Sequence, residues 1–182
     1  MLILKSSNPY KISEYTRLLK GTDVIVQEGN DLKEVLSDMD TVITHKSLAG
    51  GENVIVEDTI LIINGKPEVE IRWKYQNLKT GDKVTWVISI GVLENNQVKV
   101  YRGSVDAIVM RHDNEVGEAF EPFLVPIENN PDKLTYTDLA RIIDKDIIDP
   151  RAMAVQKLLN NDPVFVKNVE DIPVWKGDYQ ND

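Results

Sequence analysis

The first twenty residues constrain the fold most, because they place a short strand, a polar loop and a helix in direct succession. The residues from Leu2 to Lys5 suit a buried strand. Ser7 and Asn8 are both good N-caps for a helix with Pro9 in its first turn. Apolar residues then recur at helical spacing as far as Leu19. This order predicts an α/β domain whose first helix directs backbone N–H groups and a partial positive charge at anything bound above the loop.

Lys11 lies one turn into that helix and adds a full positive charge. Together, the loop and the lysine suggest an anion site. The same pattern also fits an ordinary capped helix that carries a solvated lysine. The opening stretch alone therefore does not decide between a phosphate site and a structural helix start.

Length and charge narrow the class of protein. The chain has 182 residues, 42% of them hydrophobic, which suits one α/β domain, 1–182, or two small lobes that share a core. It carries 30 acidic and 21 basic residues, a net charge of −9. This balance argues against nucleic acid or an anionic membrane as the main partner, but it leaves room for a small polyanion. The N-terminal apolar run is too short for a signal peptide core and no run approaches a membrane span, so we expect a cytoplasmic protein.

The metal-binding residue types are restricted as well. The chain has no cysteine, which excludes disulfides, thiolate zinc sites and cysteine nucleophiles. His45 and His112 are its two histidines, too few for a histidine-built metal site. Any metal is therefore expected to be hard and bound by oxygen, as Mg²⁺ is.

The middle of the chain predicts antiparallel strands. Apolar residues alternate cleanly from Lys83 to Leu93, Asn95-Asn96 predicts a turn, and runs at 97–101 and 105–110 complete a three-stranded meander with a break at Arg102-Gly103. Two helices are expected after it, at 135–143 and 149–160. Segments 31–36 and 68–78 fit neither pattern alone, and the C-terminal tail is expected to be partly ordered.

Acidic residues stand at positions where chemistry is common in α/β folds. Glu57 and Asp58 close an apolar strand that begins at Asn53, and Glu34 precedes Lys46 by twelve residues. An isolated buried carboxylate is expensive, so such groups must be solvated, paired or bound to metal. The three carboxylates could hold Mg²⁺. Equally, the strand could simply emerge into solvent, and Glu34 and Lys46 could be surface charges.

The order and spacing of these features resemble the inosine triphosphate pyrophosphatase family, which hydrolyses non-standard purine nucleoside triphosphates. The family's opening motif, Ser/Thr-x-Asn-x-x-Lys-x-x-Glu-Phe/Tyr, is matched in full from Ser6 to Tyr15. Its Leu-x-Glu segment with a lysine twelve residues later is similar to Leu32-Lys33-Glu34 and Lys46. Its Glu-Asp-Thr/Ser strand end matches 57–59. Looser similarities are carried by Arg72-Trp73, Arg102-Gly103, residues 118–122 and Lys145.

The resemblance covers about residues 2–160 and leaves 163–182 as a C-terminal extension. It implies an α/β fold of two lobes, with a long mixed β-sheet flanked by helices and an active-site cleft between the lobes. It also implies a homodimer, and the net charge of −9 leads us to expect no nucleic-acid and no membrane partner. The implied catalytic residues are Asp58, Glu34 and Lys46, and the implied Mg²⁺ ligands are Glu34, Asp58 and Glu57. The implied substrate-binding residues are Ser6, Ser7, Asn8, Lys11, Arg72, Phe120, Glu121, Lys145 and Arg151.

The departures from the family pattern are concentrated at the end that reads the base. The family closes with Ser-His-Arg, where this chain has Asp149-Pro150-Arg151 and so keeps the arginine alone. In the Phe-Gly-Trp/Tyr-Asp-Pro loop, Glu118 and Glu121 replace the phenylalanine and the aspartate. The predicted function is hydrolysis of a (deoxy)nucleoside triphosphate to a monophosphate and pyrophosphate, with base specificity altered from inosine and xanthine. The alternative is a nucleotide-binding protein of the same fold that has lost turnover.

Overall fold

The computed structural model describes residues 1–181, except for the side chains of Arg72 and Trp73. The chain forms two compact units, and strands β3, β5 and β6 contribute residues to both of them. Unit 1 comprises Met1–Asp58, Ser89–Arg102 and Ala154–Asp182. Unit 2 comprises Thr59–Ile88 and Gly103–Met153.

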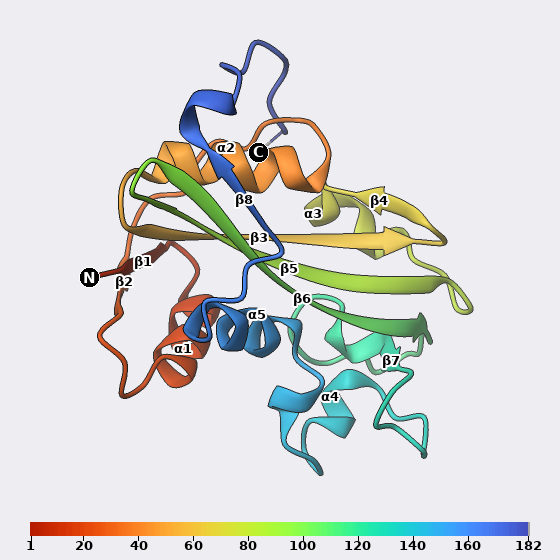
Figure 1. The fold of residues 1–182 in the computed structure, drawn as a ribbon. Coiled ribbons are helices and arrows are strands. Elements are labelled where there is room, and N and C mark those ends of the chain that lie inside the picture. Colours follow the sequence, from red (N-terminus) through yellow and green to blue (C-terminus); the bar gives the residue numbers. More distant parts are fainter. Residues whose placement is uncertain (182) are drawn as a thin grey trace. The chain divides into compact units, whose positions relative to one another are not determined.

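Helices and strands alternate in the first part of the chain, and strands dominate its middle (Figure 1). The strands are β1 Ile3–Ser6, β2 Ile25–Glu28, β3 Val54–Ile63, β4 Lys66–Glu68, β5 Lys83–Glu94, β6 Gln97–Val109, β7 Leu124–Pro126 and β8 Phe165–Asn168. The helices are α1 Pro9–Leu18, α2 Met39–Gly50, α3 Ile71–Lys74, α4 Tyr136–Leu139 and α5 Pro150–Leu159. None of these helices in the described part of the chain is long and apolar enough to span a bilayer.

The strands form an eight-stranded mixed sheet, which confirms the predicted fold class. Its main path runs β2-β1-β3-β5-β6-β7, with β4 paired to β3 and β8 paired to β6. Strand β1 runs parallel to β2 and β3, whereas β4, β7 and β8 pair antiparallel with their neighbours. In unit 1, α1 and α2 lie on opposite faces of the sheet (Figure 1).

The α2 face of unit 1 is a hydrophobic core. Ile43 of α2 packs with Val56 of β3 and with Val98 and Val100 of β6, and all four are almost fully buried. Gly91 of β5 permits the close approach of α2, because a Cβ there would lie 2.1 Å from the Ser47 hydroxyl oxygen. This packing fixes α2 against β3, the strand that contains Glu57 and Asp58.

Asparagine-containing turns set the register of two strand pairs. Asn64 and Gly65 both have positive φ and join β3 to β4, and Asn95 and Asn96 do the same between β5 and β6. Positive φ at both central residues matches the twist of a tight hairpin, and asparagine and glycine tolerate it. The turn predicted at Asn95-Asn96 is confirmed.

Unit 2 has an aromatic core of its own. The Trp86 ring of β5 lies edge to face against Phe120 at 5.1 Å and against Tyr136 at 5.3 Å between centroids. Tyr75 contacts Phe120 from the other side at 6.1 Å. These contacts hold the loop before β7 and the short helix α4 against the strands of this unit.

Three local predictions were wrong. Strand β6 is continuous from Gln97 to Val109, so the expected break at Arg102-Gly103 does not occur and the meander becomes one long hairpin. Arg102 stays in the strand because its guanidinium donates to Asp40 at 2.7 Å and to Ser89 at 2.9 Å. The helix expected at 135–143 is reduced to the four residues of α4. Strand β3 continues to Ile63, so Glu57 and Asp58 lie within the strand and do not close it as expected.

Candidate active site

The loop between β1 and α1 is held by its own side chains. Asn8 is the N-cap of α1, and its side-chain oxygen accepts from the Tyr10 amide at 2.9 Å and from the Lys11 amide at 3.4 Å. The Asn8 amide in turn donates to the Ser6 hydroxyl at 3.1 Å. These three N–H groups are therefore engaged within the loop, so an anion bound here would rely on side chains or displace the cap.

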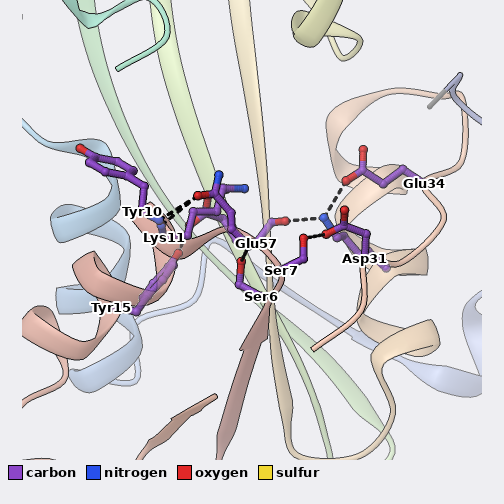
Figure 2. A network of polar contacts seen from close by, with 10 residues as sticks. Ser6, Ser7, Tyr10, Lys11, Tyr15, Asp31, Glu34 and Glu57 are labelled. Carbon is purple, nitrogen blue, oxygen red and sulfur yellow. Dashed lines mark hydrogen bonds and ion pairs between the residues drawn. The ribbon is translucent and has the colours of Figure 1, made fainter. Parts of the chain in front are cut away.

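The Ser7 hydroxyl links this loop to the segment after β2. It donates to the carboxylate of Asp31, and the Gly29 amide donates to the Ser6 carbonyl at 3.1 Å (Figure 2). Asp31 was not singled out from the sequence, because it lies in a segment without helix or strand periodicity. This contact brings the opening loop and the chain around Glu34 into one polar network.

Glu57 belongs to the α1 side of this network. The Tyr15 hydroxyl donates to one oxygen of its carboxylate, and the Lys11 ammonium lies 3.2 Å from the other (Figure 2). Glu57 is buried, and the Lys11 side chain is partly exposed. Sequence periodicity identified Tyr15 as a core residue only. The structure shows that it is both buried and a hydrogen-bond donor to a site carboxylate.

We expect Tyr15→Phe to lower the free energy of unfolding by about 2 kcal/mol, because it removes a buried hydrogen bond to a carboxylate. Chemical denaturation would measure the loss. Tyr101→Phe is a matched control, since that equally buried tyrosine makes a longer bond of 3.4 Å to the neutral amide of Asn161. An equal loss in both variants would contradict a special role for the Tyr15–Glu57 contact.

Asp58 belongs to the α2 side. Successive residues of a strand point to opposite faces, and Val56 of β3 packs on α2. Asp58 therefore faces α2, whereas Glu57 faces α1. Asp58 is 5% exposed, and burial raises its pKa to about 7, with Lys46 opposing the rise and Glu34 adding to it. The adjacent carboxylates of Glu57 and Asp58 thus lie on opposite faces of the sheet.

Lys46 of α2 joins the remaining groups. Its ammonium donates to the Glu34 carboxylate and to the Glu57 carbonyl, both at 2.6 Å. Burial lowers the pKa of Lys46, but Glu34, Asp58 and Glu57 outweigh that effect and raise the pKa above its ordinary value. The lysine stays charged and neutralises the carboxylates around it.

The fit of Mg²⁺ can be judged from these oxygen donors. Glu34 and Asp58 both lie next to Lys46 and offer hard carboxylate ligands. Among the described residues, no three His, Cys, Asp or Glu side chains lie close enough to hold a metal ion. Mg²⁺ is commonly bound by one or two carboxylates together with water and substrate phosphates. The pair Glu34 and Asp58 fits that kind of site. Participation of Glu57 as a third Mg²⁺ ligand remains a prediction.

The other predicted site residues lie in unit 2. Phe120 is 5% exposed and packs in the aromatic core there. Glu121 begins a 3₁₀ turn at 121–123, and Lys145 begins another at 145–147. Arg151 is buried at the start of α5, and its amide donates to the buried Asp149 carboxylate at 2.8 Å. The Arg72 side chain lies outside the described residues. The structure thus brings together Ser6, Ser7, Asn8, Lys11, Glu34, Lys46, Glu57 and Asp58 within unit 1.

No protein-family model matches the chain, and neither does any curated protein. Among solved structures, the chain is similar to one described as a HAM1 protein from Coxiella burnetii, with a TM-score of 0.63. The match covers 88% of this chain and 98% of that one, at 17% sequence identity. At such an identity the likeness shows a shared fold, and the chemistry must be argued from the residues themselves.

Proposed function

We propose that the protein is a nucleoside triphosphate pyrophosphohydrolase, which converts a (deoxy)nucleoside triphosphate and water to a monophosphate and pyrophosphate. The observation that carries this proposal is the Lys46 ammonium, held at 2.6 Å from Glu34 and lying beside the buried Asp58. The proposal is supported by the fold, since HAM1 proteins are of the inosine triphosphate pyrophosphatase family that the sequence motifs resemble.

Two lysines would bind the phosphates. Lys11 is fixed by Glu57 but keeps a partly exposed side chain. Lys46 donates to two acceptors among the described residues, and an ammonium has three N–H donors, so one remains for a phosphate oxygen. Ser6 and Ser7 add hydroxyl groups at the end of β1. Preorganised cations of this kind stabilise charge that develops on a transferring phosphoryl group.

Glu34 and Asp58 are the proposed Mg²⁺ ligands. When bound, Mg²⁺ lowers the pKa of a coordinated water and neutralises phosphate charge. Glu57 faces the other side of β3, so in this proposal its task is to hold Lys11 and Tyr15 in place. This division separates the role of Glu57 from that of Glu34 and Asp58.

Asp58 is the proposed general base. In the metal-free protein, burial within β3 raises its pKa to about 7, so this carboxylate is more basic than an exposed aspartate. The Lys46 ammonium neutralises the Asp58 carboxylate before the proton is taken up.

The base-reading end is proposed to differ from that of inosine-specific enzymes. Glu118, Glu121 and Asp149 stand where the family has other residues, and carboxylates accept hydrogen bonds from exocyclic amines such as those of cytosine, adenine and guanine. Specificity of this kind depends on matched polar contacts in the pocket. We therefore propose a substrate that carries an exocyclic amine.

The proposal predicts pyrophosphate release from at least one amine-bearing nucleoside triphosphate, dependent on added Mg²⁺ and abolished by EDTA. A panel of ribo- and deoxynucleoside triphosphates, assayed for pyrophosphate and for orthophosphate, tests it. Cleavage of inosine and xanthine triphosphates alone would refute the altered specificity. Release of orthophosphate in place of pyrophosphate would refute the reaction type. Nucleotide binding without any turnover would support the alternative of a binding protein.

A further inference from the structure

The C-terminal segment, residues 175–180, pairs with the chain around Glu34. The Leu36 amide donates to the Asp178 carbonyl at 2.9 Å, and the Gln180 amide donates to the Glu34 carbonyl at 2.8 Å. Between these bonds, Val35 and Tyr179 form an antiparallel bridge. The Gln180 side chain adds a further bond to the Val35 carbonyl at 3.0 Å. The backbone that directly follows the Glu34 side chain, from the Glu34 carbonyl to the Leu36 amide, is therefore tied to residues about 145 positions away in the sequence.

The same segment also contacts α2, on whose side of the sheet it lies (Figure 1). The Trp175 ring lies 5.6 Å from the His45 ring between centroids, and its indole N–H donates to the Asp178 carbonyl at 3.0 Å. Gly177 closes this turn over the ring, where a Cβ would lie 2.6 Å from a Trp175 ring carbon. His45 directly precedes Lys46 in the helix.

The segment thus connects the two elements that supply Glu34 and Lys46. Residues 29–38 contain no helix or strand apart from the bridge at Val35. Without pairing, that stretch would sample many conformations, and fixing each residue costs roughly 1–2 kcal/mol. The Glu34 carboxylate must nevertheless meet the Lys46 ammonium at 2.6 Å. The Ser7–Asp31 bond and the packing of Leu32 order the start of this stretch, and the backbone bonds from the C-terminal segment order the residues that directly follow Glu34.

Core packing does not account for the segment. Tyr179 is 43% exposed and Trp175 is partly buried against His45, so the segment places no fully buried side chain in the core. The contacts of the segment are instead directed to the Glu34 stretch, including the Lys33 ammonium at 4.9 Å from the Tyr179 ring centroid. An element that adds little to the core and fixes the backbone next to a site residue is better explained by the site than by the core.

We propose that the C-terminal segment is a positioning element for the candidate active site, and that Gln180 is its principal positioning residue. It holds the Glu34 carboxylate against Lys46, so that Glu34 is ordered before ligand binds. A ligand carboxylate ordered in advance binds more tightly because the entropy of ordering is not lost at binding. The consequence for metal and phosphate binding rests on the proposed function.

The test compares Gln180→Pro with Gln180→Ala in the full chain. Proline removes both the amide donor to Glu34 and the side-chain donor to Val35, whereas alanine removes only the side-chain donor. Val174→Ala is a control in the same tail. Three quantities are measured: hydrogen exchange of the Leu36 amide, the calorimetric affinity for Mg²⁺–tripolyphosphate, and the Mg²⁺ concentration for half-maximal turnover.

For Gln180→Pro we expect Leu36 to exchange at least about tenfold faster, and the Mg²⁺–tripolyphosphate Kd and the Mg²⁺ requirement to rise about tenfold, which corresponds to one unordered residue. Values of kcat at saturating Mg²⁺ and the midpoint of global unfolding should change little. Gln180→Ala should lie between this variant and the unchanged protein. If Gln180→Pro does not fold, Gly177→Val replaces it, because a valine there crowds the Trp175 ring. The same three measurements are made on it, and the same changes are expected.

Unchanged Leu36 exchange in Gln180→Pro, or faster exchange with unchanged Mg²⁺–tripolyphosphate affinity, overturns the inference and leaves the proposed function standing. Binding of Mg²⁺–tripolyphosphate without turnover of any nucleotide overturns the hydrolase function and leaves the inference standing. Failure of the unchanged protein to bind the probe overturns both.

Discussion

Replacing Asp58 with asparagine is expected to lower kcat for pyrophosphate release by roughly 10³-fold while nucleotide binding persists, the usual effect of removing a general base. The physical reason is that an amide cannot accept the proton for which the buried carboxylate is poised. Steady-state kinetics on the best substrate of the panel would measure the loss, and calorimetry with the same nucleotide would confirm that the site still binds. Near-full turnover would refute the assignment of Asp58 as the base.

The same substitution is expected to stabilise the metal-free protein at alkaline pH. Burial raises the pKa of Asp58 from 3.8 to about 7, so between these values the folded protein binds more protons than the unfolded chain. The free energy of unfolding then falls as pH rises from about 4 to about 7, and the deficit persists above that range. Asparagine does not titrate, so in EDTA at pH 8 we expect a gain on the order of 2 kcal/mol.

Asp82→Asn is the matched control for this stability effect. Hydrogen bonds from the Lys79 amide and the Asn64 side chain lower the pKa of that aspartate. A lowered pKa contributes stability above the unfolded value, which is lost as pH falls, so Asp82→Asn should destabilise at neutral pH. Equal signs in the two variants, measured by denaturant melts at pH 5 and pH 8, would contradict the electrostatic explanation. A gain of stability with a loss of turnover would mark Asp58 as a residue kept for function.

The elements that carry the candidate site were predictable because their signals are local. A polar N-cap before Pro9, an apolar run ending in Glu57 and Asp58, and a capped helix that contains Lys46 can each be identified within about ten residues of sequence. The structure places them as strand β1 with helix α1, strand β3, and helix α2. Strong local periodicity is the most dependable signal in a sequence, and here it also located the charged residues.

The contacts among these residues were less predictable, since they depend on pairings distant in the chain. Asp31 meets Ser7 through a loop that has no periodicity of its own. Tyr15 has the spacing of a core residue, and its bond to Glu57 becomes visible only when α1 lies on β3. The pairing of Gln180 with Glu34 is a backbone contact and leaves no mark on side-chain pattern. Sequence patterns report which face a residue occupies more readily than which partner it meets.

Strand geometry also refines the expected metal site. Three carboxylates near one strand end suggest a shared ion, yet Glu57 and Asp58 are neighbours in a strand and must face opposite sides of the sheet. Glu57 contacts Lys11 and Tyr15, and Asp58 lies near Lys46 and Glu34. One lysine therefore balances charge on each side of β3. Lys46 is the more deeply buried of these two lysines. Its removal should therefore disturb the site more than removal of Lys11.

Replacing Lys46 with methionine is expected to lower the free energy of unfolding by about 3 kcal/mol at pH 8, because breaking a buried ion pair leaves uncompensated charge. Methionine preserves most of the volume, so the loss reports the charge and its two hydrogen bonds at 2.6 Å. At pH 5.5 the loss should be smaller, since Asp58, with a pKa of about 7, is then protonated and needs no counter-charge. Denaturant unfolding at the two pH values, in EDTA, measures both quantities.

Two further variants isolate the cause of that loss. Lys74→Met removes an ammonium from an exposed pair with Glu68 at 2.9 Å and should cost far less stability than Lys46→Met, because water screens the pair. If the two residues interact, adding Asp58→Asn to Lys46→Met should raise the stability by more than Asp58→Asn does alone, because the carboxylate that it removes is then unpaired. Strictly additive effects in this cycle would mean that Lys46 and Asp58 do not interact. A positive coupling energy would establish that the lysine is retained to keep a buried carboxylate charged, which is the condition under which Asp58 can act as a base.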